Sequence, residues 1–575
     1  MEQNSLGQGM SEAPPSSLSQ NVLRKYAAQL QFLNSFGKPG APLFESYRQS
    51  KVLAIGSGPF LLSLATALFD SGLSRFHVLV TDAAATDQQR LMKLQDRARR
   101  SDSGASIDEI SLPKEGQSYW REAIRPFDSI LYVSQKGDIE ELRAIHAACR
   151  EEKKTLLPAL CIGRKGLAGP LVHPDSEGCW ESAWRRIHRS ALGYDSHPLP
   201  GFSPTAGALL ANVIVFEWFK KVTGVTELER KHPFYLLDLE TWEGSWHSYF
   251  PHPLVTGRAA AKWVQHCELR LRQTSGRSEP DIWFPYFKRL TSASSGIFHI
   301  WEEGDLKQLP LAQCRVQPAD PATHGPAELL PDIVCSGITH EEARREAALA
   351  GIEAYAARMA GSLISALPPP HGIEWNEIET KEYIGVGAGE TFAEGVCRGL
   401  QKCLNDELGK RQAKRTLSIV PVHLHEVEDE RCLFYLQALT TLQGMPAIGL
   451  EENICGFPAV WVHANDRWHG STGLNTTAAL RRALQQALQL AQNEVIDQAA
   501  NSLNTPLIME TDRIPLHLVV PASSCASHVE VLGSALQILE RNRKRLIVFD
   551  LELEPFVTGA PIEVFGVLMH EEVSP

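Results

Sequence analysis

Two glycines that follow an apolar run are the first residues with the types and spacing for chemistry. Residues 52–58 read VLAIGSG, a buried strand and a turn that contains Gly56 and Gly58. A strand, a glycine turn and a helix hold phosphates in dinucleotide sites through backbone N–H groups. Leu61 replaces the third glycine of that pattern, and Pro59 removes one N–H donor. The turn is therefore of the nucleotide-binding type but offers a phosphate fewer donors.

Asp82 ends the next apolar run, FHVLVTD. A carboxylate at the end of the second strand is where a ribose-binding residue is expected in such sites. The same position also suits a helix N-cap or a strand end that faces solvent. The sequence leaves these readings open.

The evidence for a metal site or a catalytic nucleophile is weaker than that for the glycine turn. The eleven cysteines include no CxxC pair, which excludes a tetrathiolate zinc site and is typical of reduced thiols in a cytoplasmic protein. His423 and His425 alternate on a predicted strand, but without a third ligand an exposed edge strand explains them better than a metal site. Cys525 has no histidine or aspartate at a spacing that supports a nucleophile.

Composition and charge argue against a nucleic-acid-binding protein, a secreted protein and a membrane protein. The chain has 575 residues, 43% of them hydrophobic, and a net charge of −12, which argues against broad nucleic-acid binding. A signal peptide is not expected, because the first twenty residues are polar and lack an apolar region. A membrane span is not expected either, because the glycine turn and Pro59 interrupt the uncharged stretch 52–69.

The first half must position the turn. Residues 1–47 read as a polar tail with a lead-in helix at 21–36. From 48 to 257, strand-like and helical stretches alternate, and a long apolar helix occupies 204–222. This order predicts an α/β domain with a mainly parallel sheet that is covered on both faces.

The second half is organised differently. Residues 258–575 read as an α+β domain, with Ala-rich helices at 339–361, 391–408 and 476–496. Residues 289–303 suggest a hairpin.

The span 48–257 resembles a ThiF-type adenylation domain, related to ubiquitin-activating enzymes, in its glycine turn, acidic second strand, central region and long helix. The resemblance implies a Rossmann-like fold and a vestigial nucleotide site of Gly56, Gly58, Asp82 and Arg90. Gln89 and Arg90 either match the family's nucleotide-contacting pair or form an ordinary helix surface. The nearest similarity is to ThiF-like proteins that mature thiazole-containing bacteriocins.

The family often holds structural zinc through two CxxC pairs. Ser182 stands where the partner of Cys179 would be, and Leu254 and Gly257 replace the second pair. A single thiolate does not hold structural zinc, so we expect no metal.

The second half resembles a degenerate YcaO domain. That family uses ATP, held through Mg²⁺ by helix carboxylates, to activate peptide amides. At the matching positions the three helices carry uncharged, basic or isolated acidic residues: Ala350, Glu353, Ala354, Lys402, Asn405, Asp406, Gln486 and Gln489. This implies a pseudoenzyme without a cofactor.

Together these resemblances imply a non-catalytic accessory protein in the maturation of thiazole- and oxazole-modified bacteriocins, a class of ribosomally made and modified peptides (RiPPs). Its implied partners are a YcaO-type cyclodehydratase, the precursor peptide and a second copy of the chain. Leader-peptide recognition usually belongs to a winged-helix module ahead of the ThiF-like part, for which about fifty polar residues are too few. The alternative is an active ATP-dependent adenylating enzyme that uses Asp82 and Arg90.

Overall fold

The computed structural model describes most of the chain. The described residues are 18–37, 39–111, 119–194, 203–225, 232–272, 283–368, 383–414, 416–493, 502–503, 508–509, 514–522, 527–553 and 562–571. The polar tail before residue 18 and Cys525 lie outside these ranges. The chain forms two compact units, an N-terminal unit of residues 1–184 and 189–251 and a C-terminal unit of residues 185–188 and 252–575.

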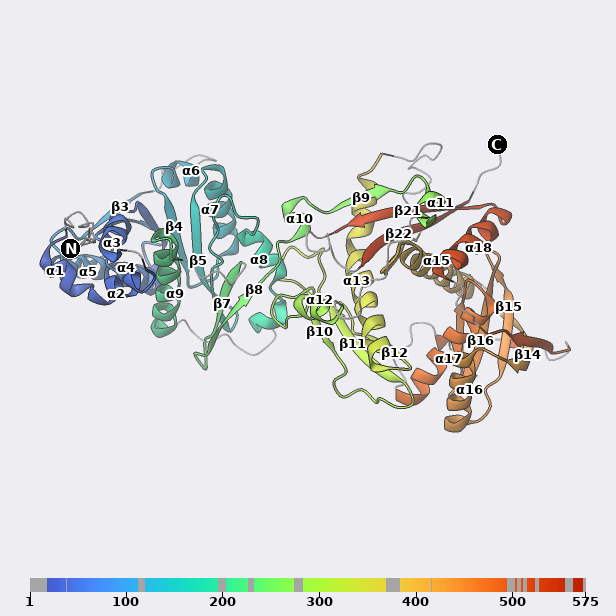
Figure 1. The fold of residues 1–575 in the computed structure, drawn as a ribbon. Coiled ribbons are helices and arrows are strands. Elements are labelled where there is room, and N and C mark those ends of the chain that lie inside the picture. Colours follow the sequence, from blue (N-terminus) through green and yellow to red (C-terminus); the bar gives the residue numbers. More distant parts are fainter. Residues whose placement is uncertain are drawn as a thin grey trace, which may run out of the picture. The chain divides into compact units, whose positions relative to one another are not determined.

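The N-terminal unit is built on one eight-stranded sheet of order β3-β2-β1-β4-β5-β6-β7-β8 (Figure 1). Its strands are β1 (Val52–Gly56), β2 (Arg75–Val80), β3 (Ser106–Ile110), β4 (Ser129–Ser134), β5 (Thr155–Ile162), β6 (Lys165–Ala168), β7 (Pro233–Asp238) and β8 (Gly244–Ser248). Neighbouring strands from β3 to β5 are parallel, and those from β5 to β8 are antiparallel.

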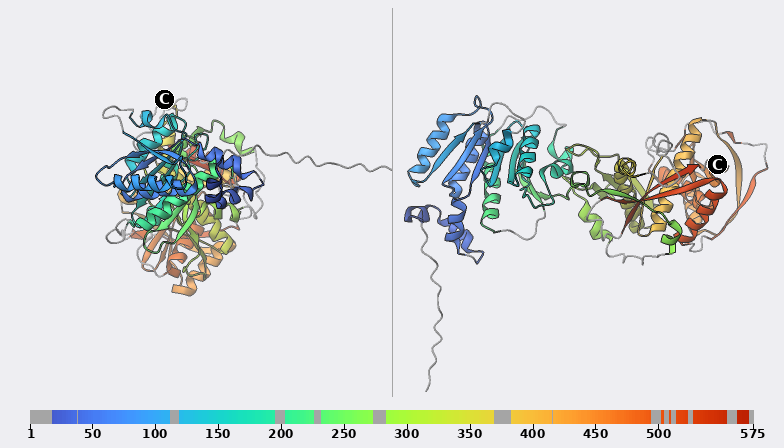
Figure 2. Two further views of the ribbon diagram at one scale, coloured as in Figure 1. Left: turned by 90° about the vertical axis from the view of Figure 1, so that its left-hand side faces the viewer. Right: turned by 90° about the horizontal axis from the view of Figure 1, so that it is seen from above.

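Helices lie on both sides of this sheet (Figure 2). The unit's helices are α1 (Gln20–Lys25), α2 (Ala27–Asn34), α3 (Gly40–Arg48), α4 (Gly58–Ser71), α5 (Gln88–Arg99), α6 (Tyr119–Ile124), α7 (Ile139–Glu151), α8 (Trp180–Arg186), a 3₁₀ turn (Arg189–Leu192) and α9 (Pro204–Val222). Alternate residues of β4 point to opposite layers. Leu131 and Val133 join the core that contains α4 and α9, whereas the Tyr132 hydroxyl donates to Glu141 of α7 at 2.6 Å.

The C-terminal unit contains three sheets among the described residues, and their orders are β10-β11-β12, β13-β22-β21-β9 and β18-β17-β16-β15-β14-β19, with β20 also paired to β14. The strands are β9 (Ala260–Trp263), β10 (Phe298–Glu302), β11 (Ala312–Pro318), β12 (Ile333–Gly337), β13 (Gly385–Gly389), β14 (Ser418–Val427), β15 (Ile448–Ile454), β16 (Phe457–Ala464), β17 (Arg467–Thr472), β18 (Ser502–Leu503), β19 (Ile508–Met509), β20 (Leu516–Val520), β21 (Lys544–Glu552) and β22 (Glu563–Glu571).

Long helices pack on these sheets. They are α13 (His340–Ser365), α15 (Phe392–Lys414), α16 (Glu430–Gln443), α17 (Thr476–Asn493) and α18 (His528–Arg541), with the shorter α10 (Pro253–Thr256), α11 (Cys267–Arg272) and α12 (Trp283–Leu290). Gly387 lets β13 lie close to α15, because a Cβ there would come within 2.0 Å of the Gly395 carbonyl oxygen. The predicted fold class, α/β followed by α+β, is confirmed.

Two predictions about single elements are wrong, and some strands were not predicted at all. The lead-in helix is divided at Tyr26 into α1 and α2. The hairpin at 289–303 does not form, because β10 pairs with β11 instead. Strands β3 and β17 went unpredicted, since polar residues and a glycine interrupt their apolar patterns. No helix among the described residues is both long and apolar enough to cross a membrane.

Candidate functional site

The glycine turn sits between β1 and α4, as the sequence predicts. Gly56 has a φ of 153°, and a Cβ there would lie 2.4 Å from the carbonyl oxygen of Val133. Gly58 has a φ of 63°, in the left-handed region that favours glycine. Leu61 is fully buried in the core of the unit. Both glycines are therefore required by backbone geometry alone.

The N-terminus of α4 is capped from within the chain. The Gly58 N–H donates to the Thr86 hydroxyl at 2.7 Å, and that hydroxyl donates to the Asp82 carbonyl at 2.9 Å. Thr86 is buried, and Pro59 has no N–H to donate. The first two residues of α4 thus offer a phosphate no backbone donor.

Asp82 and Arg90 have other local roles. One Asp82 carboxylate oxygen accepts the N–H groups of Ala84 and Ala85, and the other lies 3.5 Å from the Lys136 ammonium. Arg90 is in the first turn of α5, where its N–H donates to Asp87, and its side chain is exposed. The structure brings Asp82 next to the glycine turn through the bond from the Thr81 N–H to the Gly56 carbonyl. A nucleotide role for these residues stays a prediction.

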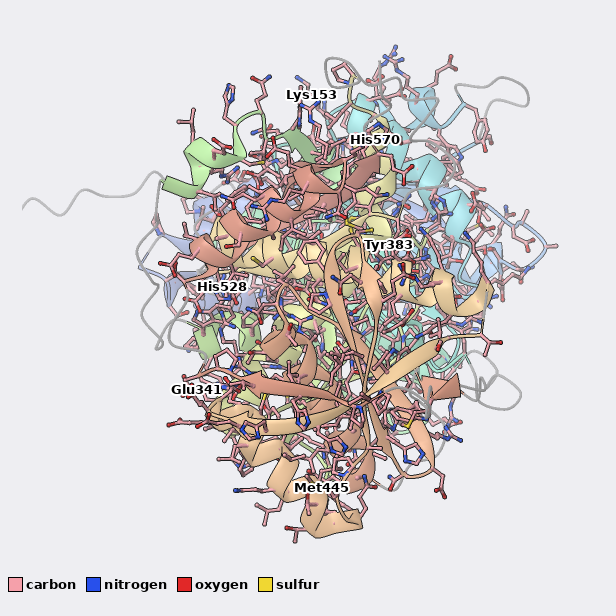
Figure 3. The ribbon with its side chains drawn as sticks, turned by 90° about the vertical axis from the view of Figure 1, so that its right-hand side faces the viewer. Lys153, Glu341, Tyr383, Met445, His528 and His570 are labelled. Carbon is pink, nitrogen blue, oxygen red and sulfur yellow. The ribbon has the colours of Figure 1, made fainter. Side chains whose placement is uncertain are left out.

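The larger candidate site is a pocket of about 1350 Å³ within the C-terminal unit. Its walls come from β12, α13, α15, α16, α17 and α18. Glu341 and His528, labelled in Figure 3, belong to two of these walls. The charged lining residues are Glu341, Glu342, Arg345, Glu346, Glu353, Glu394, Arg398, Lys402, Glu430, Arg431, Arg481 and Arg482. Three of the helices are those that the YcaO resemblance singled out.

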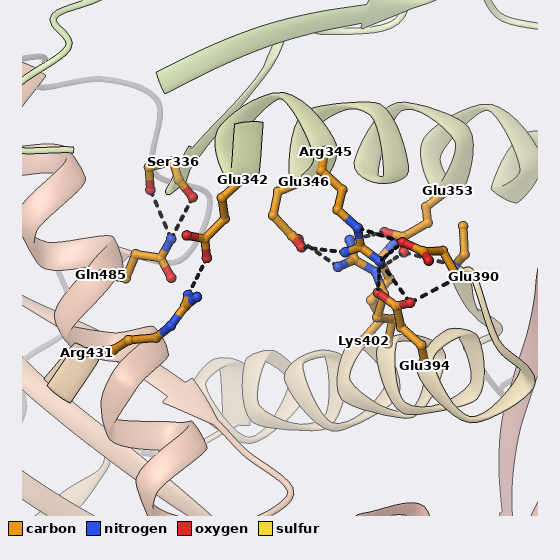
Figure 4. A network of polar contacts seen from close by, with 12 residues as sticks. Ser336, Glu342, Arg345, Glu346, Glu353, Glu390, Glu394, Lys402, Arg431 and Gln485 are labelled. Atoms are coloured by element: carbon orange, nitrogen blue, oxygen red, sulfur yellow. Dashed lines mark hydrogen bonds and ion pairs between the residues drawn. The ribbon is translucent and has the colours of Figure 1, made fainter. Parts of the chain in front are cut away.

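Ion pairs between α13 and α15 occupy several glutamates of this pocket (Figure 4). Glu353 is 2% exposed, and its carboxylate lies 2.6 Å from Arg398 and 2.8 Å from Lys402. It also accepts the Ala388 N–H at 3.0 Å. Arg398 binds Glu346 of α13 as well, at 2.6 Å. A single arginine therefore joins two glutamates two turns apart on α13.

A second group of ion pairs lies beside the first. Arg345 of α13 binds Glu394 of α15 at 2.7 Å and Glu390 at 3.1 Å. Arg431 of α16 pairs with Glu342, near the start of α13. Figure 4 shows Arg345 with its glutamates between α13 and α15, and Arg431 on another helix beside Glu342.

These contacts fix the protonation of the glutamates. Burial alone would raise the pKa of Glu353, but Arg398 and Lys402 outweigh it and lower the pKa to about 2. Burial likewise opposes ionisation of Glu346, and Arg398 and Arg345 lower its pKa. Both carboxylates are anions at neutral pH that are already matched by cations.

The donor set does not fit Mg²⁺, the metal that the YcaO resemblance implies. Mg²⁺ needs carboxylates or other oxygens free to coordinate it. Glu353 is held by Arg398 and Lys402, and the Asn405 side-chain oxygen accepts from Gln401 and Thr472. Among the described residues, no group of three His, Cys, Asp or Glu could hold a metal ion.

The facing helix α17 supplies amides and arginines. Gln485 donates to the Ser336 carbonyl at 2.8 Å, and Gln489 accepts from the Ser336 hydroxyl and donates to the Val334 carbonyl. The side chains of Arg482 and Gln486, one turn apart, make no hydrogen bond or ion pair with any described residue. Burial and the neighbouring Arg398 lower the pKa of Arg482 to about 10.

Sequence reasoning missed Arg398 and Arg482. For Arg398 a signal was present in the spacing. Arg398 and Lys402 are four residues apart, and Glu346 and Glu353 are seven residues apart, so each pair shares a helix face. Opposite charges on two facing helices indicate an ion-pair network.

The weaker candidates are also placed. His423 and His425 are exposed, in the part of β14 that pairs with β20, whereas β15 pairs only with residues 420–422 of β14. The His517 ring of β20 lies beside both, with centroids 6.1 and 6.3 Å away. Cys179 is buried and accepts the Ser182 N–H at 3.4 Å.

Comparison with known proteins gives the architecture. No protein-family model matches the chain, and no curated protein does. A solved structure described as a heterocyclase in complex with substrate and cofactor matches 97% of this chain and 84% of its own, with a TM-score of 0.56 and 13% identity. E. coli MccB matches 42% of this chain and 72% of its own, with a TM-score of 0.33 and 13% identity. The chain therefore has the fold of a heterocyclase along nearly its whole length.

Proposed function

We propose that this chain is a non-catalytic accessory protein in the maturation of thiazole- or oxazole-modified peptides. It engages the precursor peptide, a catalytic YcaO cyclodehydratase, or both, and it raises their effective concentration instead of making or breaking bonds. The observation that carries the proposal is the ion-pair network in a chain with a heterocyclase fold.

Two features support the non-catalytic part. In the C-terminal unit, Arg398 and Lys402 occupy the Glu353 carboxylate that a metal site would use. In the N-terminal unit, the Thr86 hydroxyl takes the Gly58 N–H, and Pro59 has none to give. Phosphoryl chemistry in the two families depends on a metal ion or on backbone donors at the phosphates, and these two features oppose both at Glu353 and at the glycine turn.

Reconstitution tests the proposal. The precursor peptide is incubated with ATP, Mg²⁺ and a YcaO cyclodehydratase encoded nearby, with and without this chain, and mass spectrometry follows the loss of one water per azoline. We expect the cyclodehydratase to work faster with the chain, and the chain alone to leave both ATP and peptide unchanged. Release of AMP and pyrophosphate by the chain alone would establish the adenylating alternative, and an absence of any stimulation would remove the accessory role.

A further inference from the structure

Helix α5 of the N-terminal unit carries a row of cations on one exposed face. The α5 stripe, as this row is called below, consists of Arg90, Lys93, Arg97 and Arg100. Its members are three or four residues apart, so they share a helix face, and all four side chains are exposed. At 1.5 Å of rise per residue, the stripe is about 15 Å long. Lys25 of α1 adds a further cation beside the end of α5, where it donates to the Ser101 hydroxyl at 2.8 Å (Figure 1).

No acidic side chain in the described part of the chain neutralises the α5 stripe. None of its four side chains forms an ion pair or a hydrogen bond with a described residue. The nearby acids are placed elsewhere: Asp87 is the N-cap of α5, and Asp96 on the same helix forms no ion pair. Glu109 of β3 lies on the opposite side of the helix, at the Gln88 side chain. The cations of the stripe therefore face solvent without a counter-charge from these residues.

Other arginines of the same unit do have acidic partners. Arg121 and Arg125 both bind Glu152, and Arg143 binds Glu181 at 3.0 Å. Like charges three or four residues apart destabilise a helix, so the α5 stripe lowers the stability of α5. Acidic groups from outside the chain would remove this cost.

An acidic peptide fits the α5 stripe better than a nucleic acid or a membrane does. A nucleic acid would extend its phosphates beyond the stripe over a chain whose net charge is −12, and α5 has no aromatic residue on which a base could stack. A membrane-binding helix needs an exposed apolar face, but the apolar face of α5, with Leu91, Leu94 and Ala98, packs in the core. In an extended peptide, alternate side chains are about 6.7 Å apart, so three alternate carboxylates span about 13 Å, close to the length of the stripe.

We propose that the α5 stripe binds an acidic segment of a polypeptide, which lies extended along α5 with carboxylates at alternate positions. The three arginines offer planar donor forks that match carboxylate oxygens, and Lys93 adds a point charge between them. The inference names the chemistry of a partner and does not rest on the accessory function, because it follows from the charges of α5.

Fluorescence anisotropy of the full chain with a labelled peptide of four Gly-Glu repeats provides the test, and four Gly-Gln repeats serve as the uncharged probe. We expect saturable binding of the glutamate peptide alone, which weakens as the salt concentration rises. The double variant Lys93→Glu with Arg97→Glu should weaken binding about tenfold, because each reversal replaces an attraction by a repulsion. Lys93→Gln with Arg97→Gln should weaken it less but in the same direction. A thermal melt of each variant checks that it folds.

The matched control is Lys288→Glu with Arg289→Glu, which changes the net charge equally at two exposed residues of α12 in the C-terminal unit. This control should bind the glutamate peptide as the parent does. Three results would overturn the proposal: no binding of the glutamate peptide, unchanged affinity in both α5 variants, or an equal loss in the control. Tighter binding of a single-stranded oligonucleotide or of anionic phospholipid vesicles, lost in the α5 variants, would overturn the assignment to a peptide.

Discussion

Replacing Glu353 by glutamine measures what the ion-pair network contributes to the C-terminal unit. Glutamine keeps the shape of the side chain and removes its charge, so it resembles the protonated acid. Arg398 and Lys402 then lose their shared carboxylate in a place where 2% of the Glu353 side chain is exposed. We expect clear destabilisation of the unit at neutral pH.

The size of the effect follows from the pKa. The Glu353 pKa is about 2, against an ordinary value of 4.5. Each unit corresponds to about 1.4 kcal/mol, so the ionised carboxylate stabilises the folded unit by about 3 kcal/mol relative to the neutral acid. The variant should lose about this amount.

Urea unfolding of the full chain provides the assay, with hydrogen exchange in α13 and α15 to assign the transition to the C-terminal unit. Glu426→Gln is the matched control, because Glu426 is exposed on β14, and it should change stability by less than about 0.5 kcal/mol.

The pH dependence of stability tests whether the stabilisation comes from the ionised Glu353 carboxylate. A depressed carboxylate pKa stabilises the folded state above pH 4.5, and this stabilisation is lost as the pH falls toward 2. The difference between the parent and Glu353→Gln should therefore narrow over that range. A difference near zero at pH 7, or one that does not change with acid, would refute the reasoning.

Two further predictions concern the N-terminal unit, and thermal melts measure both. Gly56→Ala should destabilise it by more than about 2 kcal/mol, because the new Cβ would lie 2.4 Å from the Val133 carbonyl oxygen; Gly361→Ala, on open helix surface, should be neutral or stabilising. Thr86→Val should cost about 1 to 2 kcal/mol, because the Gly58 N–H loses its acceptor. A Thr86→Val variant as stable as the parent would show that this cap is dispensable.

Much of the fold could be predicted from local patterns. The long helices α9, α13, α15 and α17 have unbroken helical periodicity, and β1 and β4 are uninterrupted apolar runs. Strand β3 could not be found this way, because an edge strand that is half exposed has the polar sequence SIDEI. Sheet partners such as β9 with β21 are separated by nearly the whole C-terminal unit.

The pocket was harder to predict than the helices that form it. The sequence indicated which metal-binding carboxylates are missing, but not that Glu353 is matched by Arg398, 45 residues away. Such pairs depend on how helices face one another, which single-helix spacing does not specify. That the Arg482 side chain has no ion-pair partner among the described residues likewise depends on the packing of the helices.

The bond between Gly58 and Thr86 limits how this chain could change over evolution. Restoring donors at the N-terminus of α4 requires the loss of the Thr86 hydroxyl and the replacement of Pro59. The first change alone weakens the unit, and the second alone leaves the Gly58 N–H occupied. Replacing Pro59 alone adds one N–H group, and freeing the Gly58 N–H as well needs the second, costly change, so the full set of donors is two substitutions away.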